Sequence, residues 1–287
     1  IYSGIHQIQN MRGLLELDQP AIKNIIKYLK YLLTKILTSQ KPSMLVIGDE
    51  STLRDAEPHL EQFLSQYYEG VAEIEKIERV DTPKSILPEI SSDSNPEAWC
   101  TTTPISYVAK AFKTIDFMHE KSSKLFVFSN LLKACFLHGE IREKGGAYGA
   151  MTSYNVDEGI FNMLSYRDPN LVKTTEIYKE ALKWIESGDF SQEEVDEAIL
   201  QSCSSMDTPV SPAGKAIIEY GHARKGKTKE LRERFRAGVL STTKDELLSI
   251  GRDYLSAETA IAAVTSSAIV ERDKDAYKDT KFKTFNI

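Results

Sequence analysis

Two amphipathic helices are predicted at the start of the chain. Over residues 5–17 and again over 20–37, apolar residues recur every three or four positions, which places them on one face of a helix. Pro20 suits the first turn of the second helix, where a missing N–H group leaves no bond unmade. Pro42 ends that helix, because proline cannot continue the hydrogen-bond ladder.

A short apolar run follows these helices. Met44–Ile47 has the length and composition of a strand, and Asp49 or Ser51 can cap a third helix after it. One strand cannot form a sheet by itself. We therefore expect residues 1–76 to be the closing helices and the strand of a preceding, incomplete domain.

A stretch rich in Pro, Ser and Asp divides the chain at residues 81–97. Turn-forming residues at this density indicate a linker, which we place at residues 77–96. The length of the linker indicates a domain boundary. Residues 97–287 are then expected to form a complete domain.

Strands dominate the first part of this second domain. Trp99–Phe112 is rich in β-branched and aromatic residues and predicts a strand over most of its length. Residues 125–137 have apolar residues at helical spacing and predict a buried helix. Residues 147–154 and 160–166 predict the two strands of a hairpin, joined by turn-forming residues at 155–159.

Helices dominate the rest of the domain. Gly188 is placed to close one of them, and Ser191 with Glu194 forms a capping box at the start of the next. Thr259–Ser266 predicts a closing strand, followed by a charged tail. Strands followed by helices predict the α+β class, with an antiparallel-type sheet and helices on one face. The predicted helices are 170–184, 191–206, 212–222, 228–238 and 243–255.

Composition narrows the class of protein further. The 287 residues include 42 acidic and 36 basic ones, a formal net charge of -6, which argues against nucleic acid as the main partner. No apolar run approaches the length of a membrane-spanning helix. Three widely spaced cysteines, Cys100, Cys135 and Cys203, form neither a disulfide framework nor a CxxC zinc site. Because the chain opens without Met or a leader, we interpret it as a piece of a longer protein.

Histidine spacing gives no metal site. None of the five histidines stands in the H-E-x-x-H or H-x-x-E-H pattern that presents two imidazoles to zinc. We therefore expect this chain to bind no metal. The glycine patterns of nucleotide-binding loops and the G-x-S-x-G pattern of serine hydrolases are also missing from the sequence.

The most concentrated chemistry lies in the run from Glu140 to Gly149, where the buried helix ends and a strand begins. Gly145 and Gly146 can take conformations closed to other residues, so the backbone can approach another chain closely. Arg142 and the hydroxyl of Tyr148 are both hydrogen-bond donors, suited to a carbonyl oxygen or an oxyanion. The alternative is a capped helix end with a packed tyrosine, because buried tyrosine usually finds a partner.

Several segments together resemble a known family. They are similar to the C-terminal half of pitrilysin/insulinase metallopeptidases, in the presequence-protease and falcilysin-like branch. The segments run in the order of the family over roughly residues 97–256. Those that carry the resemblance are Arg142–Gly149, Ser165–Asn170, Trp184, Ser187-Gly188, Phe190-Ser191, Val195–Ala198 and Asp207–Pro212.

The resemblance implies a pitrilysin/mitochondrial-processing-peptidase-like fold and a large clamshell of four related α+β domains. The N-terminal half of the clamshell carries an inverted zinc motif, and the zinc-free C-terminal half lends an Arg and a Tyr to the active site. Those positions match Arg142 and Tyr148 here, which we expect to be catalytic. Gly145, Gly146 and Ala147 between them are expected to bind substrate.

The whole protein is then expected to be a zinc-dependent endopeptidase that degrades unfolded peptides in a closed chamber. The zinc is expected in the N-terminal half of the same protein, and that half is the expected partner of this chain. This chain alone is expected to be inactive. A non-catalytic peptidase-like subunit or peptide-binding module is the alternative, and a plain structural α+β protein would leave the Arg and Tyr unexposed. An in-frame H-x-x-E-H motif upstream would support the endopeptidase, and its absence would support the non-catalytic subunit. The sequence does not decide the cellular location, which could be the mitochondrial matrix, another organelle or the bacterial cytoplasm.

Overall fold

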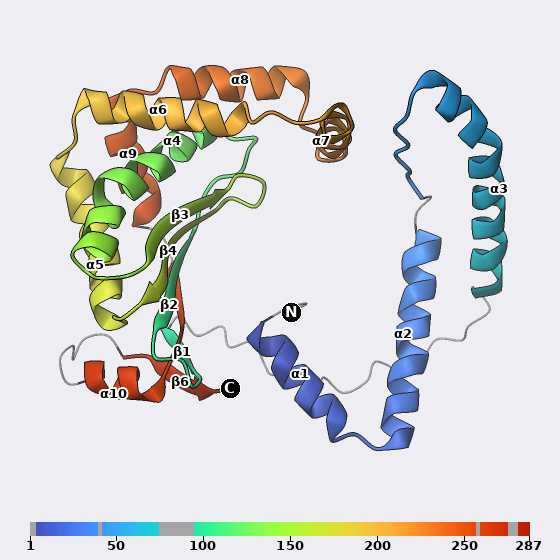
Figure 1. Cartoon of the computed structure of the whole chain (residues 1–287), viewed down its shortest axis with the longest axis horizontal. Coiled ribbons are helices and arrows are strands. Elements are labelled where there is room, and N and C mark those ends of the chain that lie inside the picture. The colour runs from blue at the N-terminus through green and yellow to red at the C-terminus, as the bar shows by residue number, and fades with distance from the viewer. Residues whose placement is uncertain (1–3, 40–41, 75–94, 257–258, 275–280) are drawn as a thin grey trace. The chain divides into compact units, whose positions relative to one another are not determined.

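The structure is a computed structural model that describes residues 4–39, 42–74, 95–256, 259–274 and 281–287 (Figure 1). The chain divides into two compact units. One comprises residues 1–91 and 210–226, and the other comprises residues 92–209 and 227–287. The linker predicted at 77–96 lies outside the described residues as far as residue 94.

The first unit is helical. Its first three helices confirm the helices predicted from apolar spacing, and Pro20 lies in the first turn of the second. Asp49 precedes the third helix and accepts hydrogen bonds from the Ser51 hydroxyl at 2.6 Å and the Thr52 N–H at 2.9 Å. These bonds hold the pKa of Asp49 well below its ordinary value. The helices are α1 (Ile5–Leu15), α2 (Gln19–Ser39), α3 (Glu50–Ile74) and α7 (Pro212–Arg224).

The strand predicted at Met44–Ile47 is not formed. Residues 42–49 have no regular secondary structure, and each of these four apolar side chains is 40–43% exposed. A strand exists only through hydrogen bonds to a neighbouring strand. The described residues of this unit contain no strand that could pair with it.

The second unit is built on a six-stranded sheet with the strand order β3-β4-β2-β5-β1-β6. Pairing is antiparallel from β3 through β5, and β1 pairs in parallel with both β5 and β6. The predicted hairpin is confirmed as β3 and β4. The strands are β1 (Glu97–Cys100), β2 (Ser106–Lys113), β3 (Gly149–Asn155), β4 (Ile160–Asp168), β5 (Thr259–Thr265) and β6 (Lys283–Asn286).

The stretch Trp99–Phe112, predicted as mostly one strand, forms two. β1 ends at Cys100, and a turn that contains Pro104 separates it from β2. The two strands are not neighbours in the sheet, because β5 from near the end of the chain lies between them. Only this long-range pairing distinguishes two short strands from one long one.

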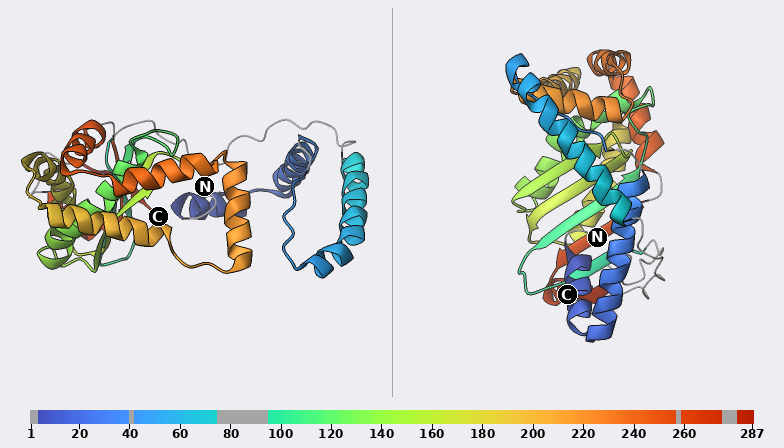
Figure 2. Two further views of the ribbon diagram at one scale, coloured as in Figure 1. Left: turned by 90° about the horizontal axis from the view of Figure 1, so that it is seen from above. Right: turned by 90° about the vertical axis from the view of Figure 1, so that its right-hand side faces the viewer.

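Helices cover one face of the sheet, and the described helices of this unit leave the opposite face open (Figure 1). The expected α+β class, with helices on one face of a mostly antiparallel sheet, is therefore confirmed. Next to α4, α6 and α8 contact each other and form an outer layer (Figure 2). The helices are α4 (Ser122–Leu132), the π-helix η1 (Lys133–Glu143), α5 (Val172–Ser187), α6 (Gln192–Met206), α8 (Lys229–Leu240) and α9 (Lys244–Leu255).

Helix ends in this unit follow the sequence closely. Ser191 and Glu194 form the predicted capping box of α6, and Gly188 closes α5 in a left-handed conformation with φ 66°. The core between sheet and helices is apolar and fully enclosed. Its largest members include Tyr178, Phe112, Phe128, Phe161 and Leu125.

The end of the chain differs from the prediction of a charged tail. Ser267–Lys274 forms helix α10, and β6 follows it. Ile269 and Asp273, four residues apart on one side of α10, are both buried. Charged residues between them conceal this short buried stripe in the sequence.

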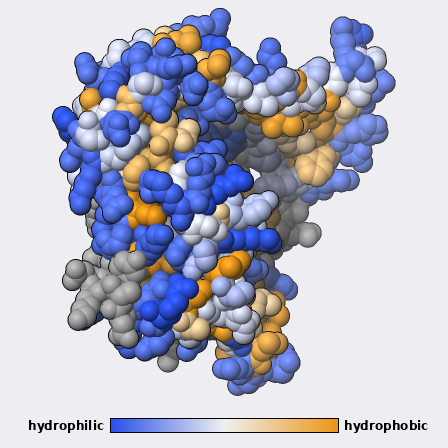
Figure 3. Space-filling model, turned by 60° about the vertical axis from the view of Figure 1, so that its left-hand side comes forward, coloured by the Kyte–Doolittle hydropathy of each residue, from blue (hydrophilic) through white to orange (hydrophobic). Residues whose placement is uncertain are grey.

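The surface of the molecule is mixed in polarity. On the face drawn in Figure 3, hydrophobic residues gather in small patches between hydrophilic ones. No helix in the described ranges is long and apolar enough to cross a membrane.

Candidate functional site

The site begins on a helix that changes from an α-helix to a π-helix along its length. α4 runs directly into η1, whose hydrogen bonds span five residues instead of four, as in the bond from Lys144 N–H to the Gly139 oxygen at 3.0 Å. Helices of this kind are rare and often occur at functional sites. Leu137 and Ile141 anchor η1 in the core, while Arg142 on the last turn is exposed.

Two glycines end this helix for different physical reasons. Gly146 has φ 78°, the left-handed region that favours glycine, and its N–H donates to the Arg142 carbonyl oxygen at 2.9 Å. Gly145 has no room for a side chain, because a Cβ atom there would lie 2.4 Å from the carbonyl oxygen of Ile141. The N–H of Ala147 bonds to that same oxygen at 3.1 Å. These bonds close the helix and turn the chain into β3.

Tyr148 leaves this turn with its side chain in solvent. Its ring is 69% exposed, and its N–H donates to the Arg167 carbonyl oxygen at 3.3 Å. The ring of Tyr166 meets it edge to face, with centroids 6.0 Å apart. The helix end is therefore closed as the alternative interpretation expected, but its tyrosine is not packed into the core.

His138 contacts the side chain of Arg142. Nη1 of Arg142 lies 3.0 Å from Nε2 of His138, and Nδ1 of His138 lies 3.3 Å from a carboxylate oxygen of Glu143. Arginine can only donate, so Nε2 accepts and the imidazole hydrogen is on Nδ1, facing Glu143. This contact was missed in the sequence, although His138 stands four residues before Arg142, the spacing that brings two helical side chains together.

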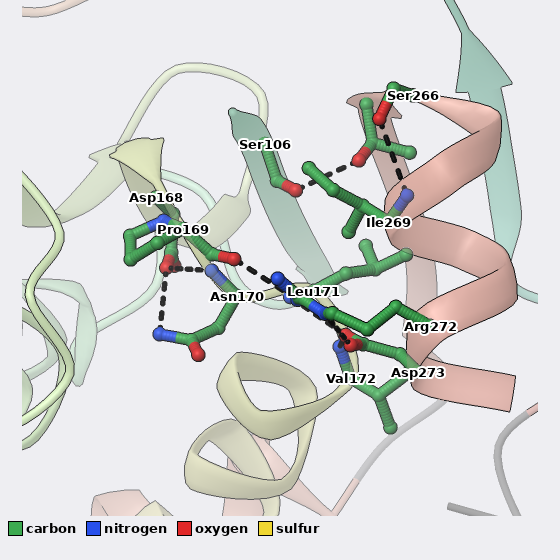
Figure 4. A network of polar contacts seen from close by, with 11 residues as sticks. Ser106, Asp168, Pro169, Asn170, Leu171, Val172, Ser266, Ile269, Arg272 and Asp273 are labelled. Atoms are coloured by element: carbon green, nitrogen blue, oxygen red, sulfur yellow. Dashed lines mark hydrogen bonds and ion pairs between the residues drawn. The ribbon is translucent and has the colours of Figure 1, made fainter. Parts of the chain in front are cut away.

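The segment Ser165–Asn170 is held by a buried carboxylate (Figure 4). Asp168 is fully buried and accepts hydrogen bonds from the Asn170 N–H at 2.8 Å and from the Thr174 hydroxyl at 2.6 Å. A buried carboxylate is tolerated when its oxygens accept hydrogen bonds in this way. Asp168 therefore fixes the path of the chain between β4 and α5.

Asn170 joins this segment to the glycine turn. Its Nδ2 atom donates to the carbonyl oxygen of Gly145 at 2.8 Å and lies 3.3 Å from Asp168. The ring of Pro169 also lies against the turn, 3.7 Å from where a Cβ of Gly146 would be. The two sequence segments that carry the resemblance thus form one structural unit around Arg142 and Tyr148.

Helix α10 supports the same unit from the other side (Figure 4). The Asp273 carboxylate accepts from the N–H groups of Leu171 and Val172 at 3.3 and 3.2 Å, which caps α5 from a distant part of the chain. Arg272 bonds to Asp273 at 2.7 Å and to the carbonyl oxygen of Pro169 at 3.1 Å. Sequence reasoning missed both residues, because they fall in the predicted charged tail.

The described residues do not fit a metal centre. Within them, no group of three or more His, Cys, Asp or Glu side chains is arranged to hold an ion. The Cys135 thiol is a poor ligand as well, since burial raises its pKa to about 12. Arg142 and the hydroxyl of Tyr148 can both donate hydrogen bonds, which suits this site to an oxygen atom of a ligand.

A protein-family model matches most of the second unit. The family model described as PreP C-terminal domain matches residues 96–266, more than half of the chain. The matched range contains Arg142, the two glycines and Tyr148.

Curated relatives match over a longer stretch. The mitochondrial presequence protease of Xenopus laevis is 29% identical over 276 residues, which cover 90% of this chain and 26% of the relative. That of Yarrowia lipolytica is 36% identical over 172 residues, 58% of this chain and 17% of the relative. The chain thus spans about a quarter of the length of the first relative.

Solved structures share the fold. A protease from Helicobacter pylori superposes with a TM-score of 0.52 at 16% identity, covering 69% of this chain and 52% of that chain. The inactive domain of an M16 peptidase from Pseudomonas fluorescens gives a TM-score of 0.52 at 15% identity, covering 67% and 46%. At such low sequence identity, these matches show a similar fold and carry no information about function.

Proposed function

The chain belongs to the PreP C-terminal domain family, and on that premise we propose that it is the zinc-free C-terminal part of a zinc-dependent endopeptidase that degrades unfolded peptides in a closed chamber. The observation that carries the proposal is the exposure of Arg142 and Tyr148 at the two ends of a rigid glycine turn. The ring of Tyr148 contacts Tyr166 edge to face but is still 69% exposed, so most of its surface is open to a ligand.

Each of these side chains has a role in the proposed reaction. The Tyr148 hydroxyl donates to the oxygen of the scissile carbonyl, which gains negative charge as the tetrahedral transition state forms. Arg142 holds a carbonyl oxygen of the peptide backbone and keeps the peptide in register. Gly145 and Gly146 flank the peptide, and Gly146 is the exposed one of the two. Ala147, which the sequence also predicted to bind substrate, is buried in the core beside them.

The zinc implied by the family lies outside this chain in the proposal. Where it is bound, such an ion polarises the carbonyl and activates water. The described residues offer no ligand group for it, so we assign them only the binding and donor steps. This chain alone is accordingly proposed to be inactive, with the N-terminal half of the same protein as its partner.

Residues 1–76 are proposed to complete a preceding domain of the same fold. Support comes from apolar side chains on α2 that stay exposed in the first unit, including Ile26, Leu29, Leu33 and Ile36. Exposed apolar faces of this size are usually covered in a finished protein. The unpaired run Met44–Ile47 then pairs with a strand from upstream of this chain.

A non-catalytic, peptidase-like subunit is the second candidate. It is favoured by the lack of a zinc-ligand group among the described residues. The two candidates differ in the sequence upstream, since only the first requires an H-x-x-E-H motif in the same protein. The mitochondrial presequence proteases among its relatives support a mitochondrial location.

A comparison of the full-length protein with this chain tests the proposal. We expect the full-length protein to bind one zinc ion per molecule and to cleave an unfolded peptide, and the separate chain to do neither. Metal analysis and peptide hydrolysis measure both quantities on the same samples. Hydrolysis by the separate chain would overturn the assignment, and a full-length protein that binds peptides without zinc or cleavage would favour the second candidate.

A further inference from the structure

Three tyrosines gather beside the glycine turn on the open face of the sheet. Tyr107 on β2 stands between Ser106 and Val108, which are buried under the helices, so its ring points to the opposite face. The ring of Tyr166 meets Tyr107 at 5.4 Å between centroids and Tyr148 at 6.0 Å, both edge to face. These contacts fix the three rings as one surface.

A bulge in β4 sets this surface. Ser106 pairs with Asp168 and Val108 with Ser165, so two residues of β4 lie opposite the single Tyr107. Extra residues of this kind redirect side chains and recur next to active sites. Here both residues of the bulge, Tyr166 and Arg167, are exposed on β4.

One of these residues, Arg167, is in a strained conformation. Its φ is 49°, and it is the only residue other than glycine with positive φ among those that the structure describes. Glycine would occupy this position without strain, so an arginine here indicates a use for its side chain. Its guanidinium lies 5.6 Å from the ring centre of Tyr166, and its carbonyl oxygen holds the N–H of Tyr148.

A row of paired apolar side chains continues across the same face of the sheet from the tyrosines. Val264 pairs with Tyr107 on one side and with Trp99 on the other, and the rings of Trp99 and Phe285 stack at 4.4 Å. Residues paired in this way lie on the same face of the sheet. Trp99 is only 8% exposed, so a peptide that reaches Tyr148 contacts the tyrosine end of this row.

We propose that Tyr107, Tyr148, Tyr166 and Arg167 form a tyrosine subsite that binds one aromatic or large aliphatic side chain of the peptide near the scissile bond. The inference rests on the proposed function of Tyr148. Rigid tyrosine rings offer a large contact area at low entropic cost. The guanidinium of Arg167 bonds to a carbonyl oxygen of the same peptide.

The charge of Arg167 also decides what the subsite rejects. Tyrosine faces alone would attract a lysine or arginine side chain. Arg167 beside Tyr166 places a like charge there, which disfavours a cationic side chain. The subsite is therefore selective for uncharged, bulky side chains. A pocket contact of this kind typically changes kcat/KM by about 10- to 200-fold.

Peptides that differ at one position test the proposal in the full-length protein. The series carries Phe, Leu, Ala or Lys at each position next to the cleaved bond in turn. At one position, the wild-type kcat/KM should favour Phe over Ala by about tenfold or more and disfavour Lys. Tyr166→Ala and Tyr107→Ala should abolish the preference for Phe. Met151→Ala, on the same face but outside the subsite, should keep it.

Arg167→Gly keeps the test valid if the tyrosine variants unfold, because glycine suits the left-handed backbone. This variant should accept the Lys peptide nearly as well as the Ala peptide. Unchanged selectivity in Arg167→Gly, or in folded Tyr166→Ala, would overturn the subsite.

A binding measurement tests the tyrosine subsite separately from the proposed peptidase function. The same peptides are titrated against the zinc-free full-length protein, with fluorescence anisotropy as the signal. Tighter binding of Phe than Ala peptide, lost in Tyr166→Ala, supports the subsite even if no peptide is cleaved. Equal affinities for all peptides would overturn it even if the enzyme is active.

Discussion

Asn170 donates a hydrogen bond from Nδ2 to the backbone carbonyl oxygen of Gly145 at 2.8 Å. The bond links the start of α5 to the turn that separates Arg142 from Tyr148. Because Gly145 itself carries no side chain, the turn depends on contacts of this kind for its position. The positions of Arg142 and Tyr148 thus depend on Asn170, which lies outside their own segment.

Removal of this bond should disturb the site more than the fold. We expect Asn170→Ala to lower the free energy of unfolding by about 1 kcal/mol, the usual net value of one hydrogen bond. The full-length enzyme should also lose kcat/KM, since Tyr148 is held less firmly. Asn155→Ala is the matched control, because the Asn155 side chain accepts bonds only within its hairpin turn. Equal kinetic losses in both variants would contradict the role of Asn170.

Gly145→Ala should be strongly destabilising. The added Cβ would lie 2.4 Å from the carbonyl oxygen of Ile141, so the helix end must open to accept it. We expect a loss of about 2–4 kcal/mol, in the upper range for single substitutions. Gly139→Ala meets nothing within 4 Å and should be neutral or slightly stabilising. Urea denaturation of this chain measures both, and a tolerated Gly145→Ala would show that the turn is not as constrained as described.

Asp273 should matter for stability although it lies in a charged stretch. Asp273→Ala leaves the N–H groups of Leu171 and Val172 without their acceptor, at a cost of about 1–3 kcal/mol. Asp273→Asn should lose less, since its amide oxygen can still accept. The exposed Asp245 on α9 serves as control and should change little when replaced by Ala. A Tm of Asp273→Ala equal to that of the control would refute the capping of α5.

The capping box of α6 predicts a specific acid sensitivity. The N–H of Ser191 bonds to the Glu194 carboxylate, and this bond lowers the pKa of Glu194 below 4.5. A lowered pKa in the folded state adds stability above the ordinary pKa, and this stability is lost as the pH falls through the lowered value. As the pH falls below 4.5, Glu194→Gln should therefore lose less stability than the wild type. Parallel curves of unfolding free energy against pH would count against this prediction.

The sequence predicted most helices and the hairpin because these depend on local patterns. Capping residues such as Ser191, Gly188 and Asp49 act within a few residues, so their effect can be read from the chain alone. Met44–Ile47 was wrong as a strand within this structure, since strand formation needs a partner. The division of Trp99–Phe112 was missed because β5 separates its parts.

The candidate site also has parts that local sequence predicts and parts that it does not. Arg142, the glycine turn and Tyr148 are contiguous, and their exposure follows from a helix end that runs into a strand. Asn170, Asp273 and the bulge at Arg167 depend on contacts between distant segments. Nothing in the local sequence of α10 indicates that Asp273 caps α5, 101 residues before it.

We propose that the hydroxyl of Tyr148 acts on the scissile carbonyl in the complete enzyme. Tyr148→Phe removes one exposed hydroxyl, so the fold should be unaffected. Loss of an oxyanion donor should lower kcat by on the order of 10²–10³, whereas Arg142→Ala should raise KM as well. The decisive measurement is kcat/KM of the Tyr148→Phe full-length enzyme on an unfolded peptide at full zinc occupancy. We predict a loss of this size with an unchanged Tm, and an unchanged kcat/KM would contradict the proposed role of Tyr148.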